Sequence, residues 1–418
     1  MADEKNTNKD VLVIGAGIVG VCCAVYLQRA GFRVTIIDRD EPGRGTSFGA
    51  AGNLGGNPHF AIPGLIWKLP RMLLDPMHPL SIRWRDLPAL AAWFRRYLAY
   101  AKPARAKAIT KASAEIGSRV FDDYESLLGE AGAPDLLTRR GRLFVWTTEE
   151  GFQRDQHGLE VRRQHGIPLQ ELTGAEVREL EPAIGPTVKR GVYTPDAGHL
   201  LNPLRVVNVL TDIFLKKGGR FLKENVRDVA IDADGCPRVR TDAVTHAPEQ
   251  LVLAAGIWSK PFAERLGTKV PLVAERGYHA MMPEPGVEMK ISTLWEERKI
   301  IFTPMEHGIR ASGIAEFSTS EAPPRYELAE RLRRSALDLI PGLNDAHYTR
   351  WMGQRPVTPD YLPVIGRSPR HPRVIFAFGH GHSGYHLGPS TGSLVAMIAA
   401  ERAPNIDVAP FRADRFQP

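Results

Sequence analysis

The stretch VLVIGAGIVGVCCAVYLQRAGFRVTIID, residues 11–38, decides the fold of this chain. Its apolar run at residues 11–14 predicts a short buried strand. Residues 21–30 then predict a helix that stops at Gly31, and the β-branched residues 33–37 predict a second strand. A strand, a helix and a strand in this order predict a βαβ unit.

Gly15, Gly17 and Gly20 stand where the first strand gives way to the helix. Such a turn lets the backbone approach a pyrophosphate, and the N–H groups of the helix then face the phosphates. Asp38 follows Gly20 by 18 residues and ends the second strand, where an acid accepts hydrogen bonds from an adenosine ribose. The pattern therefore predicts a dinucleotide site. The loop 43–56, GRGTSFGAAGNLGG, favours an extended cofactor threading past backbone amides over a mobile surface loop.

The length of 418 residues favours two domains. The formal net charge is +7, but Lys and Arg are scattered, so we expect a solvated surface and no nucleic-acid partner. Cys22, Cys23 and Cys236 form neither a disulfide framework nor a metal-binding spacing, so no metal is expected. The polar N-terminus lacks the pattern of a secretory signal, which favours the cytoplasm or the inner-membrane surface.

Residues 62–107 combine Trp, Leu, Arg and Pro. No apolar run there approaches the length of about 20 residues that spans a bilayer. Two interpretations stay open: helices that pack on the protein's own core, or an interfacial patch that touches a membrane peripherally.

The rest of the chain alternates helical and extended patterns. Helices are predicted at residues 114–129, after the capping pair Asn202-Pro203, and after Gly388. Strands are predicted at residues 141–147, 220–222, 226–231, 250–255 and 374–378, and a more antiparallel set at 277–282, 299–304 and 308–317. These elements predict an α/β fold with a βαβ core built from both ends of the chain and an inserted sheet.

Five stretches together resemble the D-amino-acid oxidase (DAO) superfamily of flavoproteins, and within it the bacterial D-amino-acid dehydrogenase small-subunit group. They occur in the order of that family and are VLVIGAGIVG with Asp38, GTSFGAAGN at 45–53, VLAAGIWS at 252–259, MGQRPVTPDYLPVIG at 352–366 and FGHGHSGYHLGPSTG at 378–392.

The resemblance implies a discontinuous Rossmann-like FAD-binding domain with an inserted α+β substrate domain that carries a mixed antiparallel sheet. We assign residues 8–90, 195–270 and 352–418 to the FAD-binding domain, and 91–194 and 271–351 to the substrate domain. FAD is expected to be held without a covalent bond. Its expected contacts are Gly15, Gly17, Ile18, Val19, Gly20, Asp38, Arg39, Thr46, Ser47, Gly52, Asn53, Val226, Ala255, Gly256, Gly353, Gly381, His382, Ser383, Gly384 and Tyr385. The helix predicted to begin at Pro389 would direct its N-terminus at the flavin.

Three residues are predicted to handle the substrate. Arg355 aligns with an arginine of related glycine oxidases that binds the substrate carboxylate, and a guanidinium suits that task. Tyr278 lies in the inserted sheet that roofs the substrate in the family, and His382 stands where some relatives carry a polar side chain. The roles of Arg276, His279 and Arg310 stay open.

The resemblance implies oxidative deamination of D-amino acids, in which hydride passes from Cα to flavin N5 and the product becomes a 2-oxo acid and ammonia. The sequence offers no compelling acid–base pair for this step, and the chemistry requires no strong side-chain base. Oxidation of a secondary amine or cyclic amino acid (D-hydroxyproline, proline or sarcosine) or of glycine is the first alternative. A flavin-bearing subunit that needs a partner is the second. The electron acceptor, a quinone or oxygen, and the oligomeric state stay open.

Overall fold

The computed structural model describes residues 9–55 and 80–417. The predicted βαβ unit is present: β1 (Asp10–Ile14) and β2 (Arg33–Asp38) are parallel neighbours joined by α1 (Ile18–Arg29). The helix begins three residues earlier than the sequence predicted. Its first free N–H, on Ile18, donates to the Ser47 hydroxyl at 3.0 Å, so a residue distant in sequence caps it.

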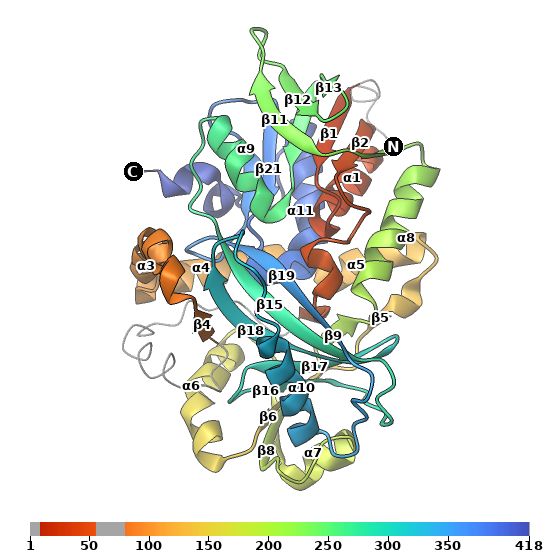
Figure 1. Cartoon of the computed structure of the whole chain (residues 1–418), viewed down its shortest axis with the longest axis vertical. Coiled ribbons are helices and arrows are strands. Elements are labelled where there is room, and N and C mark those ends of the chain that lie inside the picture. The colour runs from red at the N-terminus through yellow and green to blue at the C-terminus, as the bar shows by residue number, and fades with distance from the viewer. Residues whose placement is uncertain (1–8, 56–79, 418) are drawn as a thin grey trace.

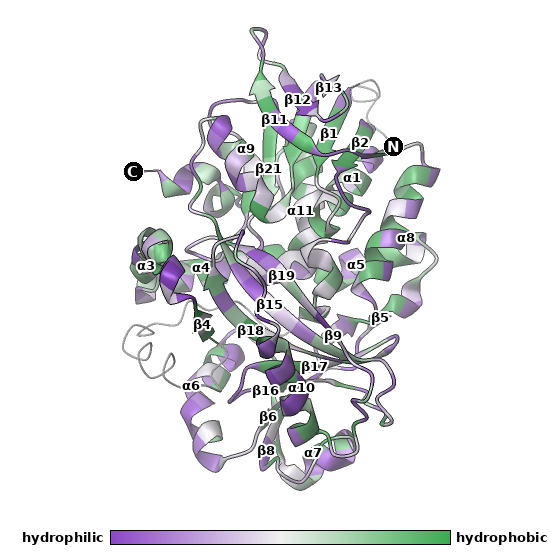
Figure 2. Ribbon diagram, viewed as in Figure 1, coloured by the Kyte–Doolittle hydropathy of each residue, from purple (hydrophilic) through white to green (hydrophobic). Residues whose placement is uncertain are grey.

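A six-stranded sheet forms the core of the first half of the molecule, in the order β10-β2-β1-β14-β21-β20 (Figure 1). All strands run parallel except β20, which is antiparallel to β21. Hydrophobic side chains dominate β1 and β21 (Figure 2) because both faces of the sheet are covered. The bounds of the added strands are β10 (Arg220–Lys223), β14 (Gln250–Leu253), β20 (Val364–Arg367) and β21 (Val374–Phe378).

Different elements cover the two faces of this sheet. The helices α1, α8 (Pro203–Lys216) and α11 (Gly384–Ala399) pack on the face that carries Val11 and Val13. The other face, with Leu12 and Ile14, packs against a small antiparallel sheet and α9 (Ser259–Arg265). The strands of that small sheet are β11 (Val226–Ile231), β12 (Pro237–Thr241) and β13 (Thr245–His246).

A large mixed sheet forms the second half, in the order β19-β15-β18-β17-β16-β6-β8-β7, with β4 beside β18. Most neighbours are antiparallel, whereas β16 with β6 and β18 with β4 are parallel. β15 and β19 cross the middle of the molecule (Figure 1) and bring this sheet against the first half. The bounds are β4 (Leu80–Ile82), β6 (Arg142–Trp146), β7 (Gln170–Thr173), β8 (Arg190–Thr194), β15 (Val273–Met282), β16 (Ser292–Trp295), β17 (Ile300–Met305), β18 (Gly308–Ser318) and β19 (Thr349–Val357).

The remaining helices lie around the large sheet and at the junction of the two halves. Among the residues that the structure describes, no helix is long and apolar enough to cross a membrane. The remaining bounds are α3 (Leu87–Tyr100), α4 (Pro103–Gly117), α5 (Val120–Glu130), α6 (Glu149–Gln164), α7 (Gly174–Leu180) and α10 (Glu327–Leu339), with β3 (Asn53–Gly55), β5 (Leu137–Thr138) and β9 (Ala197–Leu200) in a third small sheet.

Residues 62–107, for which the sequence left two interpretations, are described only from Leu80 onward. The described part contains β4, α3 and the start of α4, and its Leu90 and Trp93 are buried against Val357 and Phe317. The first interpretation, packing on the protein's own core, therefore holds for this part. Trp84 is exposed, and peripheral membrane contact stays a prediction.

Two further helix predictions are wrong in their bounds. The single helix predicted at residues 114–129 is broken into α4 and α5, where Gly117 packs so closely that an added Cβ would lie 2.4 Å from the His386 Nε2. The last helix begins at Gly384, not at Pro389, which lies inside it. Proline cannot donate to the carbonyl four residues earlier, but that carbonyl, on Tyr385, accepts the Tyr124 hydroxyl at 2.8 Å.

The predicted domain division differs from the sheets at two boundaries. Residues 80–82 were assigned to the FAD-binding domain, yet they pair with β18 of the large sheet. The boundary at residue 352 falls inside β19, which pairs with β15 along its whole length. A three-residue edge strand is too short to be recognised from periodicity, and β19 serves both halves because its end reaches the site.

Three buried histidines make the fold sensitive to acid. Burial lowers the pKa of His199 to about 4, and of His279 and His380 to about 3, because the charged imidazole loses its solvation. In the unfolded chain each of these histidines has an ordinary pKa near 6.5. Below that pH the unfolded chain therefore binds more protons than the folded chain. Stability present at pH 7 is therefore lost as the pH falls towards the folded pKa values.

We expect the free energy of unfolding to fall by about 1–2 kcal/mol per buried histidine between pH 7 and pH 5. Urea unfolding followed by circular dichroism at both pH values measures this loss. The variant His380→Gln, which cannot take up the proton, should lose less over the same interval. Equal unfolding free energies at the two pH values would contradict the expectation.

Candidate active site

A cavity of about 1300 Å³ lies between the parallel sheet and the large mixed sheet. Its lining comes from the carboxyl ends of β1, β2 and β14, from the loop 43–53, from residues 377–386 and from β15, β18 and β19. Folds with such a parallel sheet bind nucleotides at the carboxyl ends of the strands, at the point where the chain connections leave to opposite sides. In this sheet that point is at β1. Every residue predicted to contact the cofactor lines this cavity, with the exception of Gly20.

The glycine turn is built for close approach of a phosphate. Gly15 has φ +109°, and a Cβ there would lie 2.5 Å from the Ala254 carbonyl oxygen. Gly17 borders the cavity, and its added Cβ would meet the Ser47 hydroxyl at 3.2 Å. Gly20 faces the turn, where a Cβ would lie 1.9 Å from the Gly15 carbonyl oxygen. Gly20 therefore allows the helix to pack closely on the strand. Gly15 and Gly17 form the turn that a phosphate could approach.

Asp38 fixes the end of the cavity next to β2. Its Oδ2 accepts the Ala16 N–H at 2.7 Å and its Oδ1 accepts the Asp40 N–H at 3.0 Å. Burial raises the pKa of this carboxyl above its ordinary value. Arg39 lies over the Trp258 ring, 4.4 Å from its centroid, and both border the cavity. An acid at the end of this strand suits a ribose, so Asp38 would hold the adenosine of a dinucleotide at this end of the cavity.

Side chains of the loop 43–53 are used largely to hold the loop itself. Thr46 donates to the Gln354 carbonyl at 2.8 Å, and Asn53 donates to the Ala51 carbonyl at 3.1 Å. Arg310 donates to the Ala50 carbonyl at 2.6 Å. His279 lies 3.3 Å from the Gly49 carbonyl and stacks on Trp351. The role of Arg310 and His279, left open by the sequence, is to anchor this loop on the large sheet.

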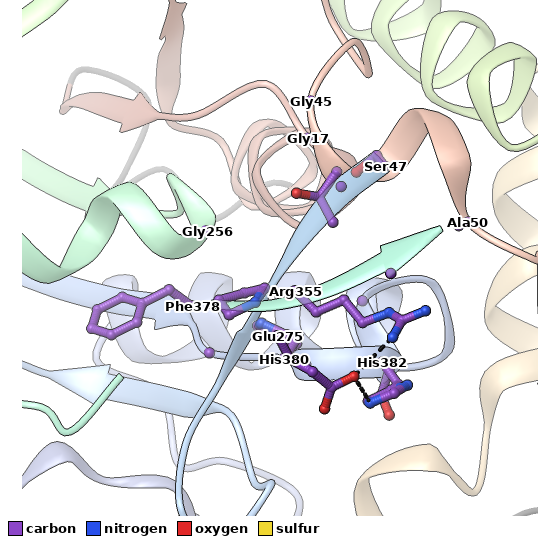
Figure 3. A pocket seen from close by; sticks show the side chains of 18 of the residues that line it. Gly17, Gly45, Ser47, Ala50, Gly256, Glu275, Arg355, Phe378, His380 and His382 are labelled. Carbon is purple, nitrogen blue, oxygen red and sulfur yellow. Dashed lines mark hydrogen bonds and ion pairs between the residues drawn. The ribbon is translucent and has the colours of Figure 1, made fainter. Parts of the chain in front are cut away.

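Arg355, Glu275 and His382 converge at the part of the cavity formed by β15, β19 and the turn before α11 (Figure 3). Glu275 and Arg355 are cross-strand partners in β15 and β19. The Glu275 Oε1 accepts a hydrogen bond from Arg355 Nη1 at 2.8 Å and lies 2.7 Å from His382 Nε2. The Tyr361 hydroxyl donates to Oε2 at 3.0 Å. Burial opposes ionisation of Glu275, but His382 and Arg355 outweigh it and lower the pKa to about 2.

The backbone around this cluster is strained. Ile314 has φ +63° and Tyr361 has φ +57°, conformations that side chains with a Cβ rarely adopt. Ile314 lies inside β18, where the register with β15 shifts, and its carbonyl accepts a hydrogen bond from Arg355 Nη1 at 3.0 Å. Strain of this kind persists only where surrounding contacts impose it, and it concentrates at functional sites.

Tyr278 and Arg276, also considered from the sequence, are engaged elsewhere. The Tyr278 hydroxyl donates to Glu316 at 2.6 Å and accepts the Arg325 N–H at 3.0 Å. Arg276 is fully buried and donates to the carbonyls of residues 319–323. Tyr278 borders the cavity, but its hydroxyl is bonded to Glu316 and to the Arg325 N–H.

Glu275 and Tyr361 are the residues that sequence reasoning missed. A glutamate inside the apolar strand VAERGYHAMM was a usable signal, because an acid there must find a cation when the strand is buried. Its partner could not be identified, since 80 residues separate Glu275 from Arg355 along the chain. The pairing of β15 with β19 alone brings them together.

Comparisons with known proteins find relatives along almost the whole chain. The chain is 34% identical over 417 residues to a D-amino-acid oxidase of Bradyrhizobium diazoefficiens, covering 98% of this chain and 99% of that protein. It is 30% identical over 419 residues to a D-amino acid dehydrogenase of Paramagnetospirillum magneticum, covering 97% and 98%. Glycine oxidase from Geobacillus kaustophilus shares the fold, with a TM-score of 0.77, 22% identity, and coverage of 99% and 100%.

The family described as FAD dependent oxidoreductase, DAO, matches residues 10–398. The predicted fold class, the predicted cofactor FAD and the predicted oxidoreductase activity are thereby confirmed. The cavity fits that cofactor, because it offers the glycine cradle, the acid at the end of β2 and about 1300 Å³ of continuous space. The chain therefore belongs to the DAO family of FAD dependent oxidoreductases.

Proposed function

We propose that this flavoenzyme oxidises amino acids at the carbon beside the amine, with D-amino acids as the first-choice substrates. The observation that carries the proposal is which nitrogen atoms of Arg355 have hydrogen-bond partners. Its Nη1 is held by Glu275 and by the Ile314 carbonyl. Among the described residues, no acceptor lies on its Nε and Nη2, and the side chain is 20% exposed where it borders the cavity. That open edge suits a carboxylate gripped in two places.

The protein's own residues position the substrate. Bound FAD supplies the acceptor for the hydride that leaves Cα. Arg355 fixes the carboxylate, which sets the position of Cα against the cofactor. Gly277 leaves room for this arrangement, because an added Cβ would lie 2.2 Å from Arg355 Nη2. The oxidised product then reacts with water to give a 2-oxo acid and ammonia.

Substrate stereochemistry rests on the names of the two curated relatives, D-amino-acid oxidase and D-amino acid dehydrogenase. A secondary or cyclic amine, or glycine, would present the same carboxylate to Arg355 and is the first alternative. A flavin-bearing subunit that needs a partner is the second. Oxygen and a quinone both stay candidates for the electron acceptor.

Anaerobic bleaching of the flavin separates these candidates. Purified holoenzyme is mixed with a panel of D-, L-, cyclic and N-methyl amino acids, and the loss of flavin absorbance near 450 nm is followed. We expect the D-amino acids to bleach fastest. Faster bleaching by proline or sarcosine would move the assignment to secondary amines, and no bleaching by any compound would contradict the proposal. Re-oxidation by air or by a soluble quinone then identifies the acceptor.

A further inference from the structure

We propose that an aromatic compartment beside Arg355 receives the side chain of the substrate, and that the enzyme favours amino acids whose side chains are large and apolar. The compartment is the part of the cavity that α3 and the carboxyl-terminal end of β18 enclose. The inference rests on the proposed oxidation of amino acids, and it names the class of side chain that the same site would accept.

Five aromatic rings pack together where α3 lies against β18 (Figure 1). The Trp93 ring stacks on Tyr97 with centroids 5.6 Å apart, and its centroid lies 5.2 Å from that of Phe317. Phe94 also meets Phe317 at 5.2 Å. Tyr361 stands edge-on to Trp93 at 6.2 Å and to Tyr97 at 6.0 Å. All five rings border the cavity, so they form one continuous aromatic wall.

This wall adjoins the proposed carboxylate clamp. The Tyr361 hydroxyl donates to Glu275 Oε2 at 3.0 Å, and Oε1 of the same carboxylate accepts from Arg355 at 2.8 Å. Ile314, whose carbonyl also accepts from Arg355, lies three residues before Phe317 on β18. A substrate carboxylate at the open edge of Arg355 is therefore close to the aromatic rings.

The side chain of such a substrate lies towards α3. The loop that contains Thr46 is expected to border FAD, and it meets β19 before Arg355, where Thr46 donates to the Gln354 carbonyl at 2.8 Å. α3 meets the strand beyond Arg355, where the Trp93 indole N–H donates to the Val357 carbonyl at 3.2 Å. A substrate that turns its reacting carbon towards the cofactor loop leaves its side chain on the side of α3.

The chemistry of this wall selects an apolar side chain. Among the described residues 80–98 and those of β18 that border the cavity, only Arg95 is charged, and it is exposed. An apolar side chain gains free energy when it leaves water for such a wall. A charged side chain loses its hydration there, and no acid of α3 or β18 borders the cavity to pair with a lysine. The apolar residues that border the compartment beside the rings are Ile82, Leu87, Ala91, Leu98 and Ala315.

The first test compares the second-order rate constants with which amino acids reduce the flavin of the wild-type holoenzyme in the absence of oxygen. The compounds are D-phenylalanine, D-leucine, D-alanine, D-aspartate and D-lysine. We expect D-phenylalanine to exceed D-alanine by about 30-fold or more, and the two charged amino acids to be slower than D-alanine. A rate constant for D-alanine, D-aspartate or D-lysine that equals or exceeds that for D-phenylalanine would overturn the proposal.

Variants of α3 provide the second test. Phe94→Ala should lower the rate constant for D-phenylalanine by about tenfold more than that for D-alanine, because only a large side chain reaches the missing ring. Phe94→Leu keeps an apolar side chain and should recover most of the preference. Ala92→Ser is the control, since Ala92 is an exposed residue of α3 that does not border the cavity. The same ratio of rate constants in Phe94→Ala as in wild type would contradict the assignment of α3.

Binding of simple carboxylates separates the compartment from the reaction. Phenylacetate and acetate have no amine to oxidise, and their binding to the holoenzyme is read from the perturbed flavin spectrum. We expect phenylacetate to bind more tightly by about tenfold or more, and Phe94→Ala to remove most of that difference. A wild type that no amino acid reduces refutes the proposed function itself. Reduction without preference for apolar side chains, or equal binding of the two carboxylates, refutes only the aromatic compartment.

Discussion

Replacing Arg355 with glutamine should lower kcat/KM for D-amino acids by about 1000-fold while the flavin stays bound. The change removes both donors of the open Nε–Nη2 edge, and two charge-assisted hydrogen bonds at about 2 kcal/mol each correspond to that factor. Glutamine can still donate to Glu275, which also keeps His382 and Tyr361 as partners. Steady-state kinetics and the flavin absorbance spectrum measure the two parts of the expectation.

A graded series makes this result specific. Arg355→Lys keeps the positive charge but loses the planar fork, so its loss should be intermediate, about 10- to 100-fold. Arg350→Lys is the matched control, because Arg350 lies on the same strand, is exposed, and packs over the Tyr326 ring. If Arg355→Gln retained wild-type kinetics, Arg355 would not be the carboxylate clamp.

Replacing Gly17 with leucine should weaken FAD binding by about 1000-fold or more. The new side chain would leave the backbone at the cavity wall, 3.2 Å from the Ser47 hydroxyl, where the pyrophosphate is expected. A branched side chain there blocks the approach of a phosphate to the N-terminus of α1. Gly17 has an extended backbone, φ −72° and ψ 175°, so leucine adopts it without strain. The protein should therefore fold without its cofactor.

Two measurements separate loss of cofactor from loss of fold. Flavin content after gel filtration gives the binding, and far-ultraviolet circular dichroism gives the fold. Gly129→Ala is the control, since a Cβ there meets open space at the surface of α5. Wild-type flavin content in Gly17→Leu would mean that the phosphates bind elsewhere in the cavity.

The sequence by itself determined the cofactor half of this protein. Gly15, Gly17 and Asp38 are close in sequence, and a strand–turn–helix unit fixes their geometry from local interactions alone. The same locality explains why β1, α1 and β2 were predicted to within a few residues. The predicted helices failed where distant contacts intervened, as at Gly117 beneath His386 and at Pro389, whose missing partner is replaced by Tyr124.

Only the tertiary structure decided the part of the site around Arg355. The sequence indicated Arg355 and His382 through a family resemblance, but it could not show that one buried carboxylate holds both. Nor could it show that Tyr278 turns its hydroxyl to Glu316. The physical reason is that β15, β19 and the turn before α11 meet through long-range strand pairing and packing. Such contacts depend on register and burial, which no local pattern of residues encodes.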